Sequence, residues 1–255
     1  MQPIVKKSSE RAGLVGPARG GHNGGKRWFM EGKPSGCPST PVIVGIDEAG
    51  RGPLAGPVVA GACVDLPELR KQPLIKDSKQ LTPGEREEAF AWITMHCTWG
   101  MGIASAEDID AVGILEATQK AMQEALAEIA KNRTPTYILI DGRDHFWFDY
   151  SHSSIIKGDE KEPCISAASI IAKVTRDRWM VDSAAREFPH YGFAVHKGYG
   201  TPEHLAAIKK YGPCPLHRRT FLKKLTAFYH TSSSSPTTTE RSPKGKTEPS
   251  ALAPA

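Results

Sequence analysis

The sequence predicts an α/β domain in which a mixed sheet is flanked by helices, with a small helical portion toward the C-terminus. Short apolar runs rich in β-branched residues alternate with longer stretches of helical periodicity, which is typical of this fold class. Two of the apolar runs, Val42–Ile46 and Thr136–Ile140, end directly in acidic residues. A long helical stretch over Pro163–Glu187 follows the last expected strand. Together these observations favour a sheet with acidic side chains gathered at one edge.

The first two strands are expected on either side of a glycine-rich turn. Val42–Ile46 is the first strand and Val58–Val64 the second. Asp47 and Glu48 lead from the first strand into the Gly-Arg-Gly segment 50–52. Glycines let the backbone adopt positive φ and approach a ligand closely, and successive N–H groups in such a turn can form an anion-binding nest. Acids that hold a metal beside a nest that holds phosphate would suit a protein that handles phosphodiesters.

The next element is a helix whose start is marked by its capping residues. Thr82 is the expected N-cap, Pro83 occupies the first helical position and Glu85 completes a capping box. This helix is expected to end near Met95. Further strands are expected over Cys97–Ala104, Thr136–Ile140 and Ser154–Lys157, and further helices over Ala106–Lys131, Pro163–Glu187, Pro202–Lys210 and His217–Phe228.

Charge and composition divide the 255-residue chain into three parts. Residues 1–40 carry seven basic and two acidic side chains and are rich in Gly, Ser and Pro, so we expect a disordered basic extension. A mitochondrial presequence is a weaker alternative there, since the glycines and prolines oppose an amphipathic helix. Residues 231–255 are dominated by Ser, Thr and Pro and are also expected to be disordered. Residues 41–230 form the expected catalytic domain, whose net charge is only −1.

The composition excludes several classes of protein. No apolar run approaches the roughly 18 residues of a membrane helix, and the N-terminus lacks the apolar core of a signal peptide. The five cysteines are scattered without a CxxC pair, which indicates reduced thiols in a cytoplasmic protein. The nearest zinc-like pattern, Cys214-x-x-His217, has no matching second half, so we expect no structural zinc.

Four acids are candidates for a divalent metal site. Asp47, Glu48 and Asp141 each follow an apolar strand, and Asp159 stands just before the long helix. The carboxyl ends of parallel strands meet at one edge of a sheet, where Asp47 and Asp141 can come together. Buried acids are costly without a compensating cation, and hard oxygen ligands suit Mg²⁺ or Mn²⁺.

Each acid also has an ordinary structural interpretation. Asp47 can cap the end of its strand while Glu48 is a solvated surface residue, and Asp141 before Gly142 can initiate a turn. Asp159 can compensate the charge of a helix N-terminus. A further difficulty is that adjacent strand residues point to opposite faces, so Asp47 and Glu48 reach one site only if the strand bends or ends between them.

Several motifs resemble those of the ribonuclease HII family. They are GIDEAGRGP at 45–53, DSKQL at 77–81, IDG at 140–142, KGD at 157–159, ISAASI at 165–170, AKVTRD at 172–177, and KGYGT at 197–201 with His204. The resemblance covers roughly residues 42–225 in order, and the two tails lie outside it.

This resemblance implies a ribonuclease H-like fold and an endonuclease that cuts RNA paired with DNA, including single ribonucleotides embedded in DNA. It implies that Asp47, Glu48, Asp141 and Asp159 hold two divalent ions, Mg²⁺ or Mn²⁺. One ion generates the attacking hydroxide and the other stabilises the leaving 3′ oxygen, which leaves 5′-phosphate and 3′-hydroxyl ends. The implied partners are RNA–DNA hybrids and ribonucleotide-containing DNA, and we expect a monomer.

By the same resemblance, the backbone of Gly50, Arg51 and Gly52 and the ring of Tyr199 read the 2′-hydroxyl sugar and its 3′ neighbour. Lys79 and a basic cluster are expected to contact phosphates; the cluster comprises Lys209, Lys210, Arg218, Arg219, Lys223 and Lys224. The alternatives are a purely structural turn, a packed aromatic ring and a solvated helix face. Lys173 and Asp177, spaced i,i+4, can simply pair along their helix. The histidines at 190, 196, 204 and 217 lack metal-like spacing, and we assign them no chemistry.

Two rival functions remain open on the sequence. One is a catalytically silent protein that binds hybrid duplexes, although that would require a broken acid set and all four acids are present. The other is a two-metal nuclease or phosphohydrolase of different specificity on the same fold.

Overall fold

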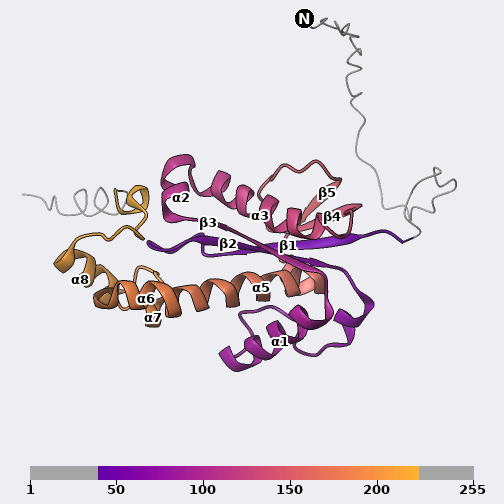
Figure 1. The fold of residues 1–255 in the computed structure, drawn as a ribbon, viewed down its shortest axis with the longest axis horizontal. Coiled ribbons are helices and arrows are strands. Elements are labelled where there is room, and N and C mark those ends of the chain that lie inside the picture. The colour runs from indigo at the N-terminus through magenta and orange to yellow at the C-terminus, as the bar shows by residue number, and fades with distance from the viewer. Residues whose placement is uncertain (1–39, 224–255) are drawn as a thin grey trace, which may run out of the picture. The chain divides into compact units, whose positions relative to one another are not determined.

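A five-stranded mixed sheet lies at the centre of residues 40–223, the part of the chain that the computed structural model describes (Figure 1). The strands follow the order β3-β2-β1-β4-β5. Their bounds are β1 Ile43–Ala49, β2 Val58–Val64, β3 Trp99–Ala104, β4 Tyr137–Asp141 and β5 His152–Ile155. β1 pairs antiparallel with β2 and β2 antiparallel with β3, whereas β4 runs parallel to β1 and β5 parallel to β4. The predicted mixed sheet flanked by helices is therefore confirmed.

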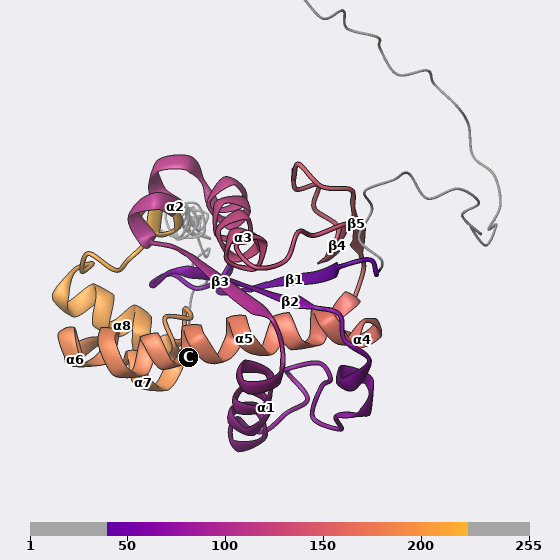
Figure 2. The same ribbon diagram turned by 45° about the vertical axis from the view of Figure 1, so that its right-hand side comes forward.

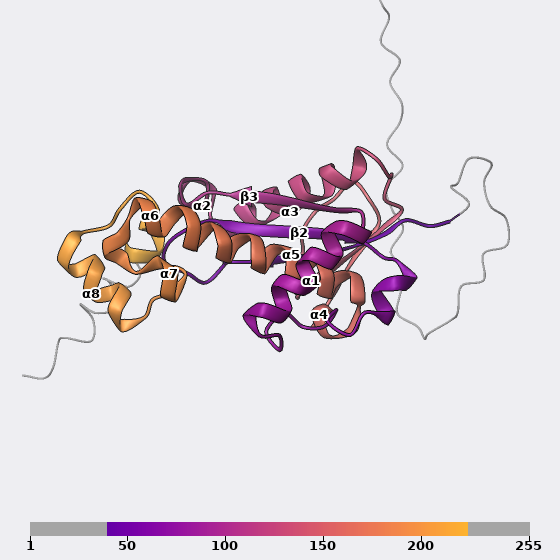
Figure 3. The same ribbon diagram turned by 60° about the horizontal axis from the view of Figure 1, so that its bottom comes forward.

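Helices cover both faces of this sheet, and three short helices lie together beyond one end of it (Figures 1, 2 and 3). α3 packs on one face, and α5, with α1 beside it, packs on the other. The helices are α1 Pro83–His96, α2 Ala106–Val112, α3 Ile114–Ala130, α4 Gly158–Lys161, α5 Pro163–Trp179, α6 Ala185–Glu187, α7 Phe193–His196 and α8 Pro202–Tyr211. A π-helical turn, Met180–Ala184, joins α5 to α6, and 3₁₀ turns cover Pro67–Lys71 and Pro189–Tyr191.

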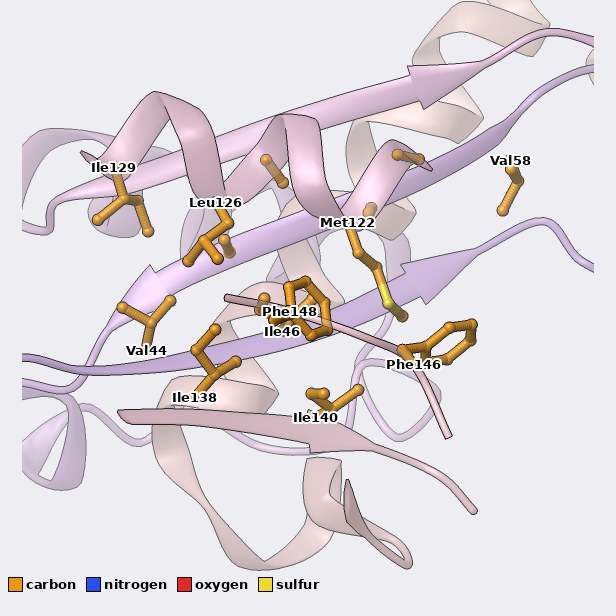
Figure 4. Close-up of a cluster of buried hydrophobic side chains, with 14 of the residues drawn as sticks. Val44, Ile46, Val58, Met122, Leu126, Ile129, Ile138, Ile140, Phe146 and Phe148 are labelled. Atoms are coloured by element: carbon orange, nitrogen blue, oxygen red, sulfur yellow. The ribbon is translucent and has the colours of Figure 1, made fainter. Parts of the chain in front are cut away.

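Each face of the sheet buries its own apolar cluster. Between α3 and the sheet, side chains such as Ile46, Ile140 and Met122 interdigitate (Figure 4). On the other face, α5 lies unusually close to β1 and β2. A Cβ added at Gly45 or Gly61 would overlap the α5 backbone at Cys164 or Ala168. This close approach brings the first turns of α5 against the strand that carries Asp47 and Glu48.

The strands and helices expected within the described residues are present, with differences in their bounds. The capping box of α1 is formed by Thr82 and Glu85 as predicted. The helical stretch predicted over Ala106–Lys131 is broken at Gly113, whose φ of +86° lies outside the helical region. The first strand continues through the acidic pair to Ala49, because β2 remains paired with it there.

The predicted tails, 1–40 and 231–255, lie almost entirely outside the described residues. Of the helix predicted at His217–Phe228, residues 219–223 are helical and residues 224–228 lie outside the described part. Within residues 40–223, no helix combines the length and the apolar character needed to cross a membrane.

Candidate active site

Three carboxylates meet at the edge of the sheet where β1 and β4 end. The register of these parallel strands pairs Ile46 with Ile140, so Asp47 and Asp141 follow at equivalent positions. Asp159 enters from the first turn of α4, immediately after β5. One ligand oxygen from each of the three acids lies within 4.8 Å of the others. The meeting of Asp47 and Asp141 across neighbouring parallel strands agrees with the sequence-based expectation.

Glu48 borders the same cleft, although it lies outside this group of three. It lines a cavity of about 380 Å³ together with Asp47 and Asp141. The pairing of β1 with β4 stops at Ile46, whereas β2 stays paired with β1 through Ala49. The strand therefore does not end between Asp47 and Glu48, as the sequence-based argument required, yet both acids line the cleft. Glu48 Oε1 accepts a hydrogen bond of 3.1 Å from Arg51. Its Oε2 is buried and has no hydrogen-bond partner among the described residues.

The electrostatics of these acids are unfavourable without a cation. Burial, followed by the charges of Glu48 and Asp141, raises the pKa of Asp47 well above its usual value. Burial also raises the pKa of Glu48, against the opposing effect of Arg51, and raises that of Asp141. Burial and mutual repulsion therefore disfavour the ionised forms. A convergent set of oxygen ligands with one buried oxygen left unpaired is chemically suited to a divalent ion such as Mg²⁺ or Mn²⁺.

Backbone and hydroxyl groups hold the acids in place. The N–H of Gly158 donates a 2.6 Å hydrogen bond to Asp141 Oδ1 at the start of α4. The Ser166 hydroxyl donates to the main-chain carbonyl of Asp159 at 2.6 Å. Lys79 Nζ donates to Asp159 Oδ2 at 3.0 Å and is otherwise exposed. In this structure Lys79 thus compensates the negative charge of Asp159, which a bound metal ion would also compensate.

The Gly-Arg-Gly turn lies beside the carboxylates, and its two glycines have different surroundings. Gly50 has a φ of +97°, and a Cβ there would overlap the side chain of Arg176. Gly52 has no such constraint: a Cβ there would lie 4.0 Å from the Tyr199 ring, at ordinary contact distance. Arg51 pairs with Glu48 and, at 2.7 Å, with Asp144. Glycine is therefore required at position 50 by its positive φ. At position 52 the absence of a side chain leaves the surface opposite Tyr199 open.

Tyr199 stands across the cleft from this turn. It lines the same cavity as the acids and Gly50, and 45% of it is exposed. The guanidinium of Arg176 lies 5.9 Å from the centre of its ring. The structure thus brings together Asp47, Glu48, Asp141, Asp159, Gly50, Arg51, Gly52, Lys79 and Tyr199, all the residues singled out from the sequence for metal and sugar binding.

The expectation that Arg218 contacts phosphate is wrong. Its side chain is fully buried and donates five hydrogen bonds to main-chain carbonyls; the acceptors belong to Gly50, Arg51, Pro53 and Gly56. Its neighbour Arg219 is exposed, as are Lys209 and Lys210 on α8. Lys224 lies outside the described residues. The predicted i,i+4 pair of Lys173 and Asp177 is present at 3.0 Å.

Sequence reasoning also missed Arg176 and Ser169. Arg176 donates to the carbonyls of Ala55, Pro57 and Lys197, which ties the turn to the loop that carries Tyr199. Ser169 lines the cavity, and its hydroxyl lies 2.9 Å from that of Ser78. Ser169 belongs to the ISAASI motif and Arg176 to the AKVTRD motif, both on α5. Their spacing does not show whether these polar side chains are buried or exposed.

Comparison with known proteins decides between the possible families. A family model described as Ribonuclease HII matches residues 44–224. The chain belongs to the ribonuclease HII family. A Ribonuclease HII from Geobacter metallireducens is 48% identical over 180 residues, which cover 70% of this chain and 83% of the relative. One from Geobacillus thermodenitrificans is 52% identical over 181 residues, covering 70% and 68% respectively.

The fold agrees with this assignment. The crystal structure of ribonuclease H2 from Pyrococcus horikoshii OT3 is similar with a TM-score of 0.59 and 28% identity, covering 76% of this chain and all of the other. Ribonuclease HII proteins are metal-dependent endonucleases of the ribonuclease H class, which act on RNA–DNA hybrids, and the chain is one of them.

Divalent ions are expected to stabilise this protein measurably. A ligand that binds only the folded state adds about 2.7 kcal/mol to the free energy of unfolding at a concentration 100 times its Kd. Thermal unfolding with increasing Mg²⁺ or Mn²⁺ should therefore show a rising melting temperature, and Glu48→Gln should weaken that rise. An unchanged melting temperature at tens of millimolar of either ion would contradict a metal site at these acids.

Proposed function

We propose that this endonuclease cuts the RNA strand of RNA–DNA hybrids and also incises DNA at single embedded ribonucleotides, leaving 5′-phosphate and 3′-hydroxyl ends. We further propose that Asp47, Glu48, Asp141 and Asp159 hold two divalent ions, Mg²⁺ or Mn²⁺. The observation that carries the proposal is the cleft itself: three convergent carboxylates and an unpaired buried Glu48 oxygen face a glycine turn and an aromatic ring.

The protein groups have distinct roles in this scheme. When bound, divalent ions supply charge neutralisation and Lewis-acid activation for in-line displacement at phosphorus. The four acids would hold the ions, and the turn at Gly50–Gly52 offers main-chain groups to the ribose. Tyr199 packs against the adjoining sugar. Lys79, which pairs with Asp159 here, would be able to approach a phosphate if a cation compensated that acid instead.

The substrate side of the proposal rests on the 2′-hydroxyl, which distinguishes RNA from DNA at one nucleotide. A backbone can read this group only where it comes close to the sugar, and the absence of a side chain at Gly52 leaves such an approach open opposite Tyr199.

A cleavage assay with four duplexes tests this function. The substrates are a long RNA–DNA hybrid, a DNA duplex with one ribonucleotide, an all-DNA duplex and an all-RNA duplex, each with Mg²⁺ or Mn²⁺. We expect cleavage of the first two only, with 5′-phosphate and 3′-hydroxyl products. Equal cleavage of the all-DNA duplex would instead favour a nuclease of other specificity, and binding of hybrid without cleavage would favour a silent binder.

Tyr199→Ala is expected to reduce activity most on the single-ribonucleotide duplex. Loss of an aromatic stacking contact typically costs about 1–3 kcal/mol, which corresponds to roughly tenfold to a hundredfold in rate. A long hybrid offers alternative registers, so the loss there should be smaller. The measurement is kcat/KM on both substrates.

Tyr211→Ala is a matched control, because Tyr211 is similarly exposed but lies on α8, outside the cavity. We expect this control to retain activity on both duplexes. Equal losses on the two substrates for Tyr199→Ala would make Tyr199 a general packing residue.

A further inference from the structure

Three histidines lie beside the loop that carries Tyr199. His204 and His217 are buried, and His196 stacks on His204 with ring centres 4.3 Å apart. Tyr191 and Phe193 pack against the edges and faces of these rings. The sequence gives these histidines no metal-like spacing, and in residues 40–223 the acidic group alone has the geometry of a metal site.

The hydrogen bonds of two of these rings define a single chain of donors and acceptors. The main-chain N–H of Cys214 donates to His217 Nδ1 at 2.9 Å, so this nitrogen carries a lone pair. The Cys214 thiol sulfur, at 3.1 Å, and its carbonyl, at 3.3 Å, lie near the same nitrogen. A neutral His217 then carries its proton on Nε2, which faces His204 Nε2 at 3.0 Å.

The chain ends at the main chain of Tyr199. Because His204 Nε2 accepts from His217, the proton of a neutral His204 is on Nδ1. That N–H donates to the Tyr199 carbonyl at 2.8 Å. The same carbonyl accepts from Thr201 N–H at 2.8 Å, and the Tyr199 N–H donates to the His196 carbonyl at 2.9 Å. Burial lowers the pKa of both imidazoles, that of His204 to about 4, which keeps the chain neutral near neutral pH.

We propose that His204 and His217 are positioning residues for substrate recognition: their directed pair of imidazoles fixes the main chain of Tyr199, and so sets the ring against the sugar beside the scissile phosphate. This relay, the hydrogen-bonded series Cys214–His217–His204–Tyr199, rests on the proposed role of Tyr199. It extends that role to residues that never touch substrate. It runs from the Cys214 amide, beside α8, through two side chains to the cleft. An apolar side chain of similar size would fill the same space but would leave the Tyr199 carbonyl with one donor fewer.

Amide substitutions can separate the two ring nitrogens. The Asn amide reaches the place of a histidine Nδ1, and the Gln amide reaches the place of Nε2. At position 204, His204→Asn keeps the donor to Tyr199, whereas His204→Gln loses it. At position 217 the order is reversed: His217→Gln keeps the donor to His204 Nε2, whereas His217→Asn loses it.

The relay therefore predicts a crossover in kcat/KM on the single-ribonucleotide duplex. His204→Gln and His217→Asn should each lose about tenfold, the size expected for one buried hydrogen bond, while His204→Asn and His217→Gln should stay within about threefold of the parent. Melting temperatures of all four full-length variants identify an assay temperature at which each is folded. If only packing mattered, Asn and Gln would rank in the same order at both positions. The relay instead predicts that Asn is tolerated better at position 204 and Gln better at position 217.

A double-mutant cycle shows whether the histidines act through Tyr199. In the Tyr199→Ala background, His204→Gln should cause little further loss, because the group that it positions is gone. A full additional tenfold loss, or the absence of the crossover while Tyr199→Ala alone is impaired, would overturn the relay and leave the role of Tyr199 standing. A fully active Tyr199→Ala would overturn both.

Discussion

Replacing Asp47 by Asn is expected to abolish nearly all cleavage, by about a thousandfold or more. Asp47 converges with Asp141 and Asp159 and also adjoins Glu48, so its loss should disrupt the whole proposed ligand set. Metal ions typically contribute several kcal/mol of transition-state stabilisation, and each 1.36 kcal/mol corresponds to a factor of ten in rate. The measurement is single-turnover cleavage of a hybrid at saturating Mg²⁺.

The same substitution should not destabilise the metal-free protein. The buried Asp47 carboxylate is disfavoured by burial and by the charges of Glu48 and Asp141, and a neutral amide of the same shape relieves that repulsion. We therefore expect an unchanged or higher melting temperature in the absence of metal. Asp182→Asn is a suitable control, because Asp182 is an exposed acid of the π-helical turn, outside the cavity. A strong loss of stability in Asp47→Asn would show that the acid is structural.

Replacing Arg218 by Lys is expected to lower the free energy of unfolding by about 3 kcal/mol or more. The guanidinium supplies five hydrogen bonds to four main-chain carbonyls around the glycine-rich turn. Hydrogen bonds from charged groups contribute about 1.5–3 kcal/mol each, and a compact ammonium cannot reproduce the planar fork. For a domain of this size the melting temperature should fall by about 6–12 °C. Cleavage should fall as well, because the turn beside the acids loses its anchor.

Arg219→Lys is the matched control, one residue further along the chain. Arg219 is exposed, and its contact with Asp110 is made by its main-chain N–H, which the substitution leaves in place. We expect almost no change in melting temperature or in activity at moderate salt. Equal effects at the two positions would show that Arg218 acts as a general surface charge, as its sequence context first indicated.

The elements of this fold can be predicted from the sequence where a local rule applies. The capping box of α1 and the strand-terminal position of Asp141 depend on neighbouring residues only, and both are confirmed. The break at Gly113 is also local, but a single glycine within a helical pattern is often tolerated. The course of β1 through Asp47 and Glu48 depends on its pairing with β2, which no local pattern contains.

The clamps around the site depend on contacts between distant parts of the chain. Arg218 lies more than 160 residues from the turn that it holds, and Arg176 lies about 120 residues from two of its three acceptors. The sequence analysis grouped Arg218 with helix-surface charges and gave Arg176 no role, because burial of an arginine is determined by the tertiary fold. The proposed role of His204 and His217 likewise depends on a contact between their rings, which forms only in the folded chain. Motif resemblance located the carboxylates, yet the residues that support them required the structure.

We propose that the acids at the ends of β1 and β4 support metal-dependent cleavage at ribonucleotides. The most direct test is cleavage of a DNA duplex with one ribonucleotide by the parent protein and by Asp47→Asn, each with EDTA and after Mg²⁺ is restored, with the product ends mapped. We predict that only the parent protein with Mg²⁺ cuts, leaving 5′-phosphate and 3′-hydroxyl ends. Cleavage in EDTA, or comparable cleavage by Asp47→Asn, would contradict the account.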